Sequence, residues 1–187
     1  MQKILFVDRD GTIIKETTDE RIDSFEKLTF YPKALYFLAK IAQHLDYEIV
    51  MVTNQDGLGT DHFPYNSFNP VHDFIVKSFE NEGVVFKEIL IDVTFPNENA
   101  TTRKPFTGLI EHYIADKNYD LKNSIMIGDR LTDVEFAKNF GGKAIYINDK
   151  THLGTSEISV KQEELQPFIA LETNNWKKIY KFLKKHS

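Results

Sequence analysis

What the sequence lacks excludes several classes of protein. It contains no cysteine, and no apolar run in it approaches the ~18 residues that a membrane-spanning helix needs. Disulfide bonds and a thiolate zinc site are therefore excluded, and no membrane partner is expected. An apolar segment begins at Ile4, so close to Met1 that no signal peptide fits before it. The cytoplasm is therefore the expected location.

Positive charge is also scarce. Lys and Arg number 23 against 28 Asp and Glu, which gives a formal net charge of −5. A protein that follows a nucleic-acid backbone needs a basic face, so nucleic acid is not an expected partner. A small phosphorylated substrate is compatible with this balance, because a metal ion and a few local cations can offset a weakly acidic surface.

Enough apolar residues remain for a sizeable core, since 41% of the 187 residues are hydrophobic and 13% aromatic. Short apolar runs alternate with segments of helical spacing, a pattern typical of an α/β protein. Strands are predicted at residues 4–7, 48–52, 89–93, 124–127 and 144–147, and helices at 33–44, 71–82, 107–117, 133–139 and 175–186. The alternation predicts a three-layer, Rossmann-like parallel sheet with helices on both faces.

We expect two regions along the chain. Residues 1–150 should form the core. Residues 151–187 should form a C-terminal extension whose last helix docks on that core, either within the same domain or as the start of a linker. The stretch 151–173 is polar and predicted to be irregular. Three long connections, at 15–31, 55–70 and 94–106, follow strands and are expected to border the functional site.

Polar motifs stand directly after four of the predicted strands. Asp8-Arg-Asp10-Gly-Thr12 follows the first strand, and Thr53-Asn54-Gln55 follows the second. Arg103-Lys104-Pro105 follows the third strand after a loop, and Gly128-Asp129 with Asp133 follows the fourth. Because the carboxyl ends of parallel strands lie at one edge of a sheet, these residues should come together there.

This set of side chains suits the hydrolysis of a phosphomonoester. Asp8 and Asp129, with the backbone carbonyl of Asp10, should form an oxygen-rich Mg²⁺ site. Asp8 is the predicted nucleophile, and Asp10 the predicted acid and base. Lys104 and the Thr53 hydroxyl should stabilise the transferring phosphoryl group.

Other residues receive supporting roles. Thr12 should orient Asp10. Asp133 should either fix the metal ligands or Lys104, or be only an N-terminal helix residue that the helix dipole stabilises. The predicted substrate-binding residues are Asn54, Gln55, Arg103 and Glu16. Asp19 and Glu20 are alternatives to Glu16 for binding an ammonium group, because the loop from Lys15 to Asp23 is net acidic.

The motifs, in this order, resemble those of the haloacid dehalogenase-like (HAD) superfamily of aspartate-nucleophile phosphatases. Two further segments, Ser24-Phe-Glu-Lys-Leu28 and Met51-Val-Thr-Asn-Gln-Asp-Gly-Leu-Gly59, resemble those of the histidinol-phosphate phosphatases within it. The resemblance implies a HAD fold without a large cap domain. It also implies Mg²⁺-dependent conversion of L-histidinol phosphate to L-histidinol and phosphate in histidine biosynthesis. A covalently or non-covalently associated imidazoleglycerol-phosphate dehydratase domain is the implied partner.

The sequence departs from that family in one loop. Relatives often carry a Cys/His zinc loop before the Arg-Lys-Pro element, but residues 92–102 contain neither cysteine nor histidine. No zinc is therefore expected, and hydrogen bonds and packing should hold the loop.

Other functions remain open on the sequence alone. A heptose 1,7-bisphosphate phosphatase or another small-molecule HAD phosphatase is the main alternative, although the acidic first loop favours an amino-alcohol substrate over a second phosphate. A polynucleotide 3′-phosphatase lacks the basic strip that it would need. A phospho-receiver domain is disfavoured, because an acid and base such as Asp10 would shorten the life of its aspartyl phosphate.

Overall fold

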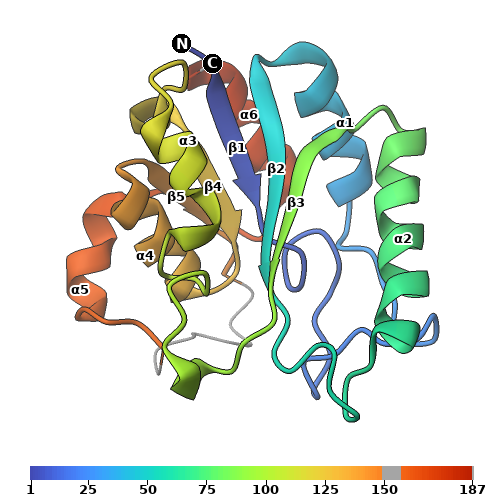
Figure 1. Ribbon diagram of the computed structural model, residues 1–187. Coiled ribbons are helices and arrows are strands. Elements are labelled where there is room, and N and C mark those ends of the chain that lie inside the picture. The colour runs from blue at the N-terminus through green and yellow to red at the C-terminus, as the bar shows by residue number, and fades with distance from the viewer. Residues whose placement is uncertain (149–156, 187) are drawn as a thin grey trace.

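One parallel sheet organises the chain (Figure 1). The computed structural model describes residues 1–148 and 157–186, so the predicted boundary at residue 150 and part of the predicted irregular stretch lie outside the described residues. The strands lie in the order β3-β2-β1-β4-β5-β6. They are β1 (Lys3–Val7), β2 (Tyr47–Asn54), β3 (Phe86–Asp92), β4 (Ile125–Gly128), β5 (Lys143–Tyr146) and β6 (Ile169–Glu172). The order reverses between β1 and β4, and ligands of open α/β sheets bind at such a reversal.

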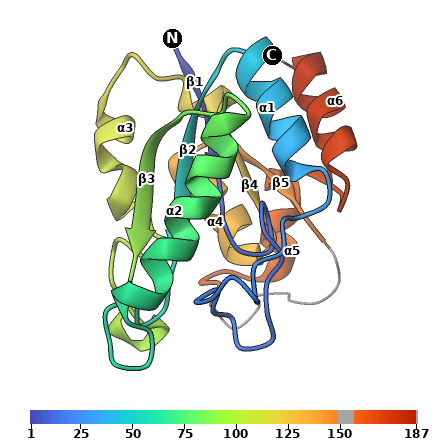
Figure 2. The same cartoon turned by 90° about the vertical axis from the view of Figure 1, so that its right-hand side faces the viewer.

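Helices cover both faces of the sheet (Figure 2). One face carries α1 (Ala34–His44), α2 (Tyr65–Asn81) and α6 (Trp176–His186), and the other carries α3 (Glu111–Ala115), α4 (Leu131–Phe140) and α5 (Gln162–Leu165). This three-layer arrangement confirms the predicted fold class.

The sequence of β1 explains why it lies at the centre. Leu5 and Val7 pack into the core shared with α1 and α6, while Ile4 and Phe6 pack into the core on the α4 side. All four side chains are fully buried, as expected of a parallel strand covered on both faces. The strand therefore holds its carboxyl end, and Asp8 with it, at a fixed place in the sheet.

Two helix predictions need correction. The predicted helix 71–82 begins six residues earlier, at Tyr65, and contains Pro70. Proline removes a backbone donor, which disfavours a helix interior, but the helix continues past it because Phe68, Val71 and Ile75 are buried on one side. The predicted helix 107–117 is shorter, because a 3₁₀ turn at Gly108–Ile110 precedes α3, which ends at Ala115.

A strand was missed in the C-terminal region. Residues 151–173 were predicted to be irregular, yet β6 extends the sheet beside β5, and α5 precedes it. The run Phe168-Ile-Ala-Leu171 marks the strand in the sequence, but the strand is only four residues long and half-buried. The predicted docking helix is present, because Trp176, Ile179 and Leu183 of α6 are buried and α6 packs against α1.

The two ends of the sheet differ in what they carry. The start of β1 and the end of α6 lie together at one end (Figures 1 and 2). The polar motifs follow the opposite, carboxyl ends of the strands. Between β1 and α1, residues 8–33 form turns and isolated bridges without a helix or strand, so no large cap domain is inserted there. In the part of the chain that the structure describes, no helix is long and apolar enough to span a membrane.

Candidate active site

A pocket of about 250 Å³ opens at the carboxyl ends of the strands. It brings together residues from all four predicted motifs and from all three long loops. Its lining residues are Asp8, Asp10, Glu16, Asp19, Glu20, Arg21, Thr53, Asn54, Asp56, Phe95, Arg103, Lys104, Arg130, Thr132, Asp133 and Glu157.

Lys104 lies at the bottom of the pocket between two carboxylates. Its Nζ is 2.7 Å from Asp8 Oδ1 and 2.7 Å from Asp133 Oδ1, and all three residues are buried. Burial alone would favour the neutral amine, but the charges of Asp133 and Asp8 outweigh it and raise the pKa of Lys104. Burial also raises the pKa of Asp8 to about 6, although the charge of Lys104 opposes this.

Three buried carboxylates at this point could hold a metal ion. Asp8, Asp129 and Asp133 each offer one oxygen atom, and these atoms lie within 4.8 Å of one another. Burial and the neighbouring charges of Asp8 and Asp133 raise the pKa of Asp129 well above its ordinary value. One lysine does not neutralise three carboxylates, so a divalent cation would relieve their repulsion. An all-oxygen set is what hard cations prefer.

Gly11 allows the chain to pass close to this cluster. Its φ is +70°, and a Cβ atom built there would lie 1.9 Å from Asp129 Oδ2. Any larger residue would push into the carboxylate that the cluster needs. The Asp-x-Asp-Gly spacing is thus required by the packing of the first motif against the fourth.

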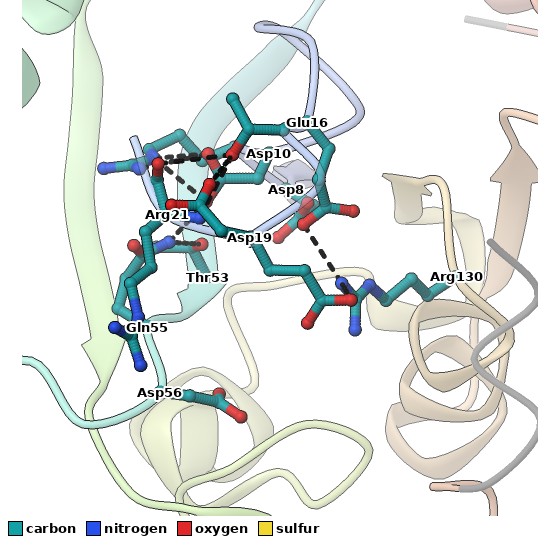
Figure 3. A network of polar contacts seen from close by, with 12 residues as sticks. Asp8, Asp10, Glu16, Asp19, Arg21, Thr53, Gln55, Asp56 and Arg130 are labelled. Atoms are coloured by element: carbon teal, nitrogen blue, oxygen red, sulfur yellow. Dashed lines mark hydrogen bonds and ion pairs between the residues drawn. The ribbon is translucent and has the colours of Figure 1, made fainter. Parts of the chain in front are cut away.

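Asp10 is held by Arg9 and Gln55, whose contacts with it were not predicted from the sequence. Arg9, which is fully buried, donates from Nε and Nη2 to Asp10 Oδ1 at 3.1 and 3.0 Å. Gln55 Nε2 donates to Asp10 Oδ2 at 2.5 Å and to Thr53 Oγ1 at 2.9 Å (Figure 3). Because the Thr53 oxygen accepts this bond, its own proton is available to donate into the pocket.

Three predicted roles differ in the structure. The Thr12 hydroxyl has no hydrogen-bond partner among the described residues, so it does not orient Asp10; instead the Thr12 carbonyl accepts from the Trp176 indole at 3.2 Å. Gln55 does not line the pocket and contacts Asp10 and Thr53. Asn54 does line it, but its amide bonds twice to the backbone of Lys104, at 3.1 Å each, and so positions that lysine.

Asp133 combines both alternatives left open for it. Oδ1 accepts from Lys104, while Oδ2 accepts from the backbone N–H of Arg130 at 3.0 Å at the start of α4. The carboxylate therefore joins the helix N-terminus to Lys104. A fixed helix start gives the cluster a rigid support.

Charged side chains surround the mouth of the pocket. Glu16 accepts from Arg130 at 3.0 Å, and Figure 3 shows the two side chains pointing toward one another. Burial raises the pKa of Glu16 to about 7, while Arg130 opposes the shift. Arg103 donates to Asp56 at 2.5 Å and to Glu157 at 2.7 Å. Neither Asp56 nor Glu157 was predicted, although Asp56 lies within the segment Met51–Gly59 that carries the family resemblance.

Hydrogen bonds close the loop at residues 92–102, which contains no cysteine or histidine to bind zinc. Asp92 Oδ1 accepts from the backbone and hydroxyl of Thr94 at 2.9 and 2.6 Å. Asp92 Oδ2 accepts from Thr102 at 2.5 Å, across ten residues of chain. One carboxylate thus joins both ends of the loop directly before Arg103 and Lys104.

Comparisons with known proteins agree with this geometry. The chain is 47% identical over 183 residues to the histidine biosynthesis bifunctional protein HisB of Bacteroides fragilis, covering 97% of this chain and 47% of that protein. It is 46% identical over 188 aligned positions to the HisB protein of Spirosoma linguale, covering 98% and 49%. A family model described as HAD-hydrolase-like matches residues 101–164. The chain is therefore similar to the HAD-like hydrolases.

Solved structures of HAD-like hydrolases share this fold. The D,D-heptose 1,7-bisphosphate phosphatase of B. bronchiseptica, crystallised with magnesium and phosphate, aligns with a TM-score of 0.80 at 21% identity over 100% of both chains. A putative HAD-like phosphatase of Mesorhizobium loti aligns with a TM-score of 0.75 at 22% identity over 100% of this chain and 88% of the other. The chain spans about half the length of the HisB relatives that it matches.

Proposed function

We propose that the chain is a Mg²⁺-dependent phosphatase that converts L-histidinol phosphate to L-histidinol and phosphate. The observation that carries the proposal is the buried contact of Lys104 with Asp8 in a pocket that also holds Asp10. The names of the HisB relatives support a place in histidine biosynthesis. Because those relatives are described as bifunctional, we propose that a dehydratase domain is the partner of this activity, either fused to it or associated with it.

Asp8 is the proposed nucleophile. One of its oxygen atoms attacks the phosphorus atom, the bond from phosphorus to the ester oxygen breaks, and an aspartyl phosphate forms. Lys104 and the Thr53 hydroxyl contact the phosphoryl oxygens and stabilise the charge that develops on them. Lys104 can do so at ordinary pH, because Asp8 and Asp133 keep its ammonium group protonated.

Asp10 is the proposed acid and base. It gives its proton to the departing alcohol, then removes a proton from the water that attacks the aspartyl phosphate, which frees phosphate and restores Asp8. Arg9 and Gln55 hold its two oxygen atoms near the pocket. Orientation by two neighbours lowers the cost of bringing Asp10 into line with either proton transfer.

Asp8 and Asp129 are the proposed side-chain ligands of Mg²⁺, together with the backbone carbonyl of Asp10. The ion would supply positive charge that lets an anionic nucleophile approach an anionic phosphate. Asp133 lies close enough to serve as a ligand too, but both of its oxygen atoms already accept hydrogen bonds, so we propose that it supports the ligands.

A panel of substrates tests the proposal. Phosphate release should be measured from L-histidinol phosphate, heptose 1,7-bisphosphate, a 3′-phosphorylated oligonucleotide and p-nitrophenyl phosphate, with and without Mg²⁺. A strong Mg²⁺-dependent preference for L-histidinol phosphate is expected. Similar weak rates on all four would leave a phosphatase without the proposed substrate, and a preference for the bisphosphate would favour the alternative.

A further inference from the structure

One side chain in the pocket comes from beyond the last recognised motif. Glu157 lies beyond β5, and it lines the pocket beside the residues of the strand ends. We propose that Glu157 is a specificity-determining residue: it neutralises Arg103 and Arg130 together, so that the pocket accepts a phosphomonoester with a cationic tail and rejects one with a second phosphate. The inference rests on the proposed phosphatase activity and concerns its choice of substrate.

The two carboxylate oxygens of Glu157 face different guanidinium groups. Oε2 accepts from Arg103 Nη2 at 2.7 Å, and Oε1 lies 3.6 Å from Arg130 Nη1. The exposed fractions of the side chains are 7% for Arg103, 21% for Glu157 and 23% for Arg130. At this degree of burial the charges interact more strongly than they would on an open surface.

Two arginines in a phosphatase pocket could bind a second phosphate. A guanidinium group is always charged and matches phosphate oxygens with paired donors. Here each arginine also has carboxylate partners of its own, since Arg103 pairs with Asp56, and Arg130 with Glu16. Glu157 is the one carboxylate among the described residues that contacts both, so it removes the shared positive charge between them.

The charges at the mouth, taken together, favour the binding of a cation. Away from the catalytic cluster, the pocket lining holds five carboxylates and three guanidinium groups, and the Lys27 ammonium that pairs with Asp19 adds a fourth cation. They are Glu16, Asp19, Glu20, Asp56 and Glu157, against Arg21, Arg103 and Arg130. An ammonium or imidazolium group is attracted by this excess of negative charge, and a second phosphate is repelled.

A buried contact keeps Glu157 in place. Ser159 stands two residues after Glu157. Its backbone N–H donates to Glu135 at 2.8 Å, and its hydroxyl donates to the same carboxylate. Glu135 is fully buried in α4, where an unpaired carboxylate would be costly. Helix α4, which begins at Leu131, therefore also anchors the segment that brings Glu157 to the mouth.

The test compares Glu157→Gln with wild type. Glutamine keeps the size of the side chain and removes its charge. We expect kcat/KM for L-histidinol phosphate to fall and that for heptose 1,7-bisphosphate to rise, each on the order of tenfold, as one charge at such distances allows. The rate on p-nitrophenyl phosphate, whose tail is uncharged, should change little. Glu163→Gln is the matched control, because it removes an exposed charge in α5, outside the pocket.

Each outcome decides the matter. If Glu157→Gln leaves the ratio of the two charged substrates unchanged, or lowers all three rates equally, Glu157 does not determine specificity. The same holds if Glu163→Gln shifts the ratio as much. If wild type hydrolyses p-nitrophenyl phosphate but not L-histidinol phosphate, the proposed function fails. In that case, the expected increase in kcat/KM of Glu157→Gln for heptose 1,7-bisphosphate, relative to that for p-nitrophenyl phosphate, still tests the role of Glu157. Thermal melting confirms that both variants fold.

Discussion

Replacing Lys104 by methionine tests how much burial strengthens the ion pairs of Lys104 with Asp8 and Asp133. The ammonium group lies 2.7 Å from both Asp8 and Asp133, and the three side chains are 4%, 10% and 2% exposed. Methionine keeps most of the apolar stem, so little cavity is created, but two buried carboxylates lose their cation. Removing one partner of a buried pair costs about 3–5 kcal/mol. We expect the free energy of unfolding of the metal-free protein to fall by about that amount.

Lys27 offers a matched control on the surface. Its Nζ also has two carboxylate partners, Asp19 at 2.6 Å and Asp23 at 2.8 Å, but its side chain is 32% exposed. Exposed pairs contribute about 0–1 kcal/mol, so Lys27→Met should have a small effect. Urea unfolding at about neutral pH, without divalent cations, measures both values. Equal losses for the two variants would refute the argument from burial. Asp133→Asn added to Lys104→Met should restore part of the stability but none of the phosphate release.

Four further predictions concern the reaction. Asp8→Asn should abolish phosphate release with an unchanged circular dichroism spectrum, and residual turnover would point to another nucleophile. Asp10→Asn should slow turnover by roughly 10²–10⁴-fold while Mg²⁺ still binds in calorimetry; unchanged turnover would remove Asp10 from acid–base catalysis. The pKa of Glu16 is raised to about 7, so its carboxyl is neutral below that pH and charged above it. KM for a cationic substrate should therefore fall as the pH rises through about 7, and Glu16→Gln should remove this dependence. Without metal, the pKa of Asp8 is raised from 3.8 to about 6. The protonated Asp8 carboxyl therefore contributes to folding stability in full below pH 3.8, and this contribution is lost as the pH rises through about 6. Because protons compete with Mg²⁺ for Asp8, added Mg²⁺ should raise the melting temperature more at about pH 8 than at about pH 5. An equal rise at both pH values would contradict proton competition. Chelation of divalent cations should abolish phosphate release, because the proposed reaction needs Mg²⁺.

Much of the cluster of Asp8, Asp129 and Lys104 could be predicted because the places of its two carboxylates depend on backbone position alone. Asp8 and Asp129 each follow an apolar strand directly, and parallel strands bring such positions to one edge whatever the loops do. Lys104 was predicted from its motif, although eleven residues of loop separate it from β3. The structure brings Lys104 to Asp8.

The surroundings of the cluster could not be predicted in the same way. Arg9 stands between two recognised carboxylates, yet only the packed structure shows that it turns toward Asp10. Gln55 was expected to meet substrate and instead contacts Asp10, because an amide suits either partner equally. Glu157 depends on the path of a polar segment after β5. Such contacts arise from tertiary packing, which local patterns do not encode.

The two ends of the sheet have separate uses. Both described chain ends lie at the amino end of the strands, and the pocket lies at the carboxyl end. The five residues of β1 alone place about 17 Å between them. A second domain or an affinity tag joined after α6 would leave the entrance open to solvent. The chain could therefore be immobilised through that end without blocking the pocket.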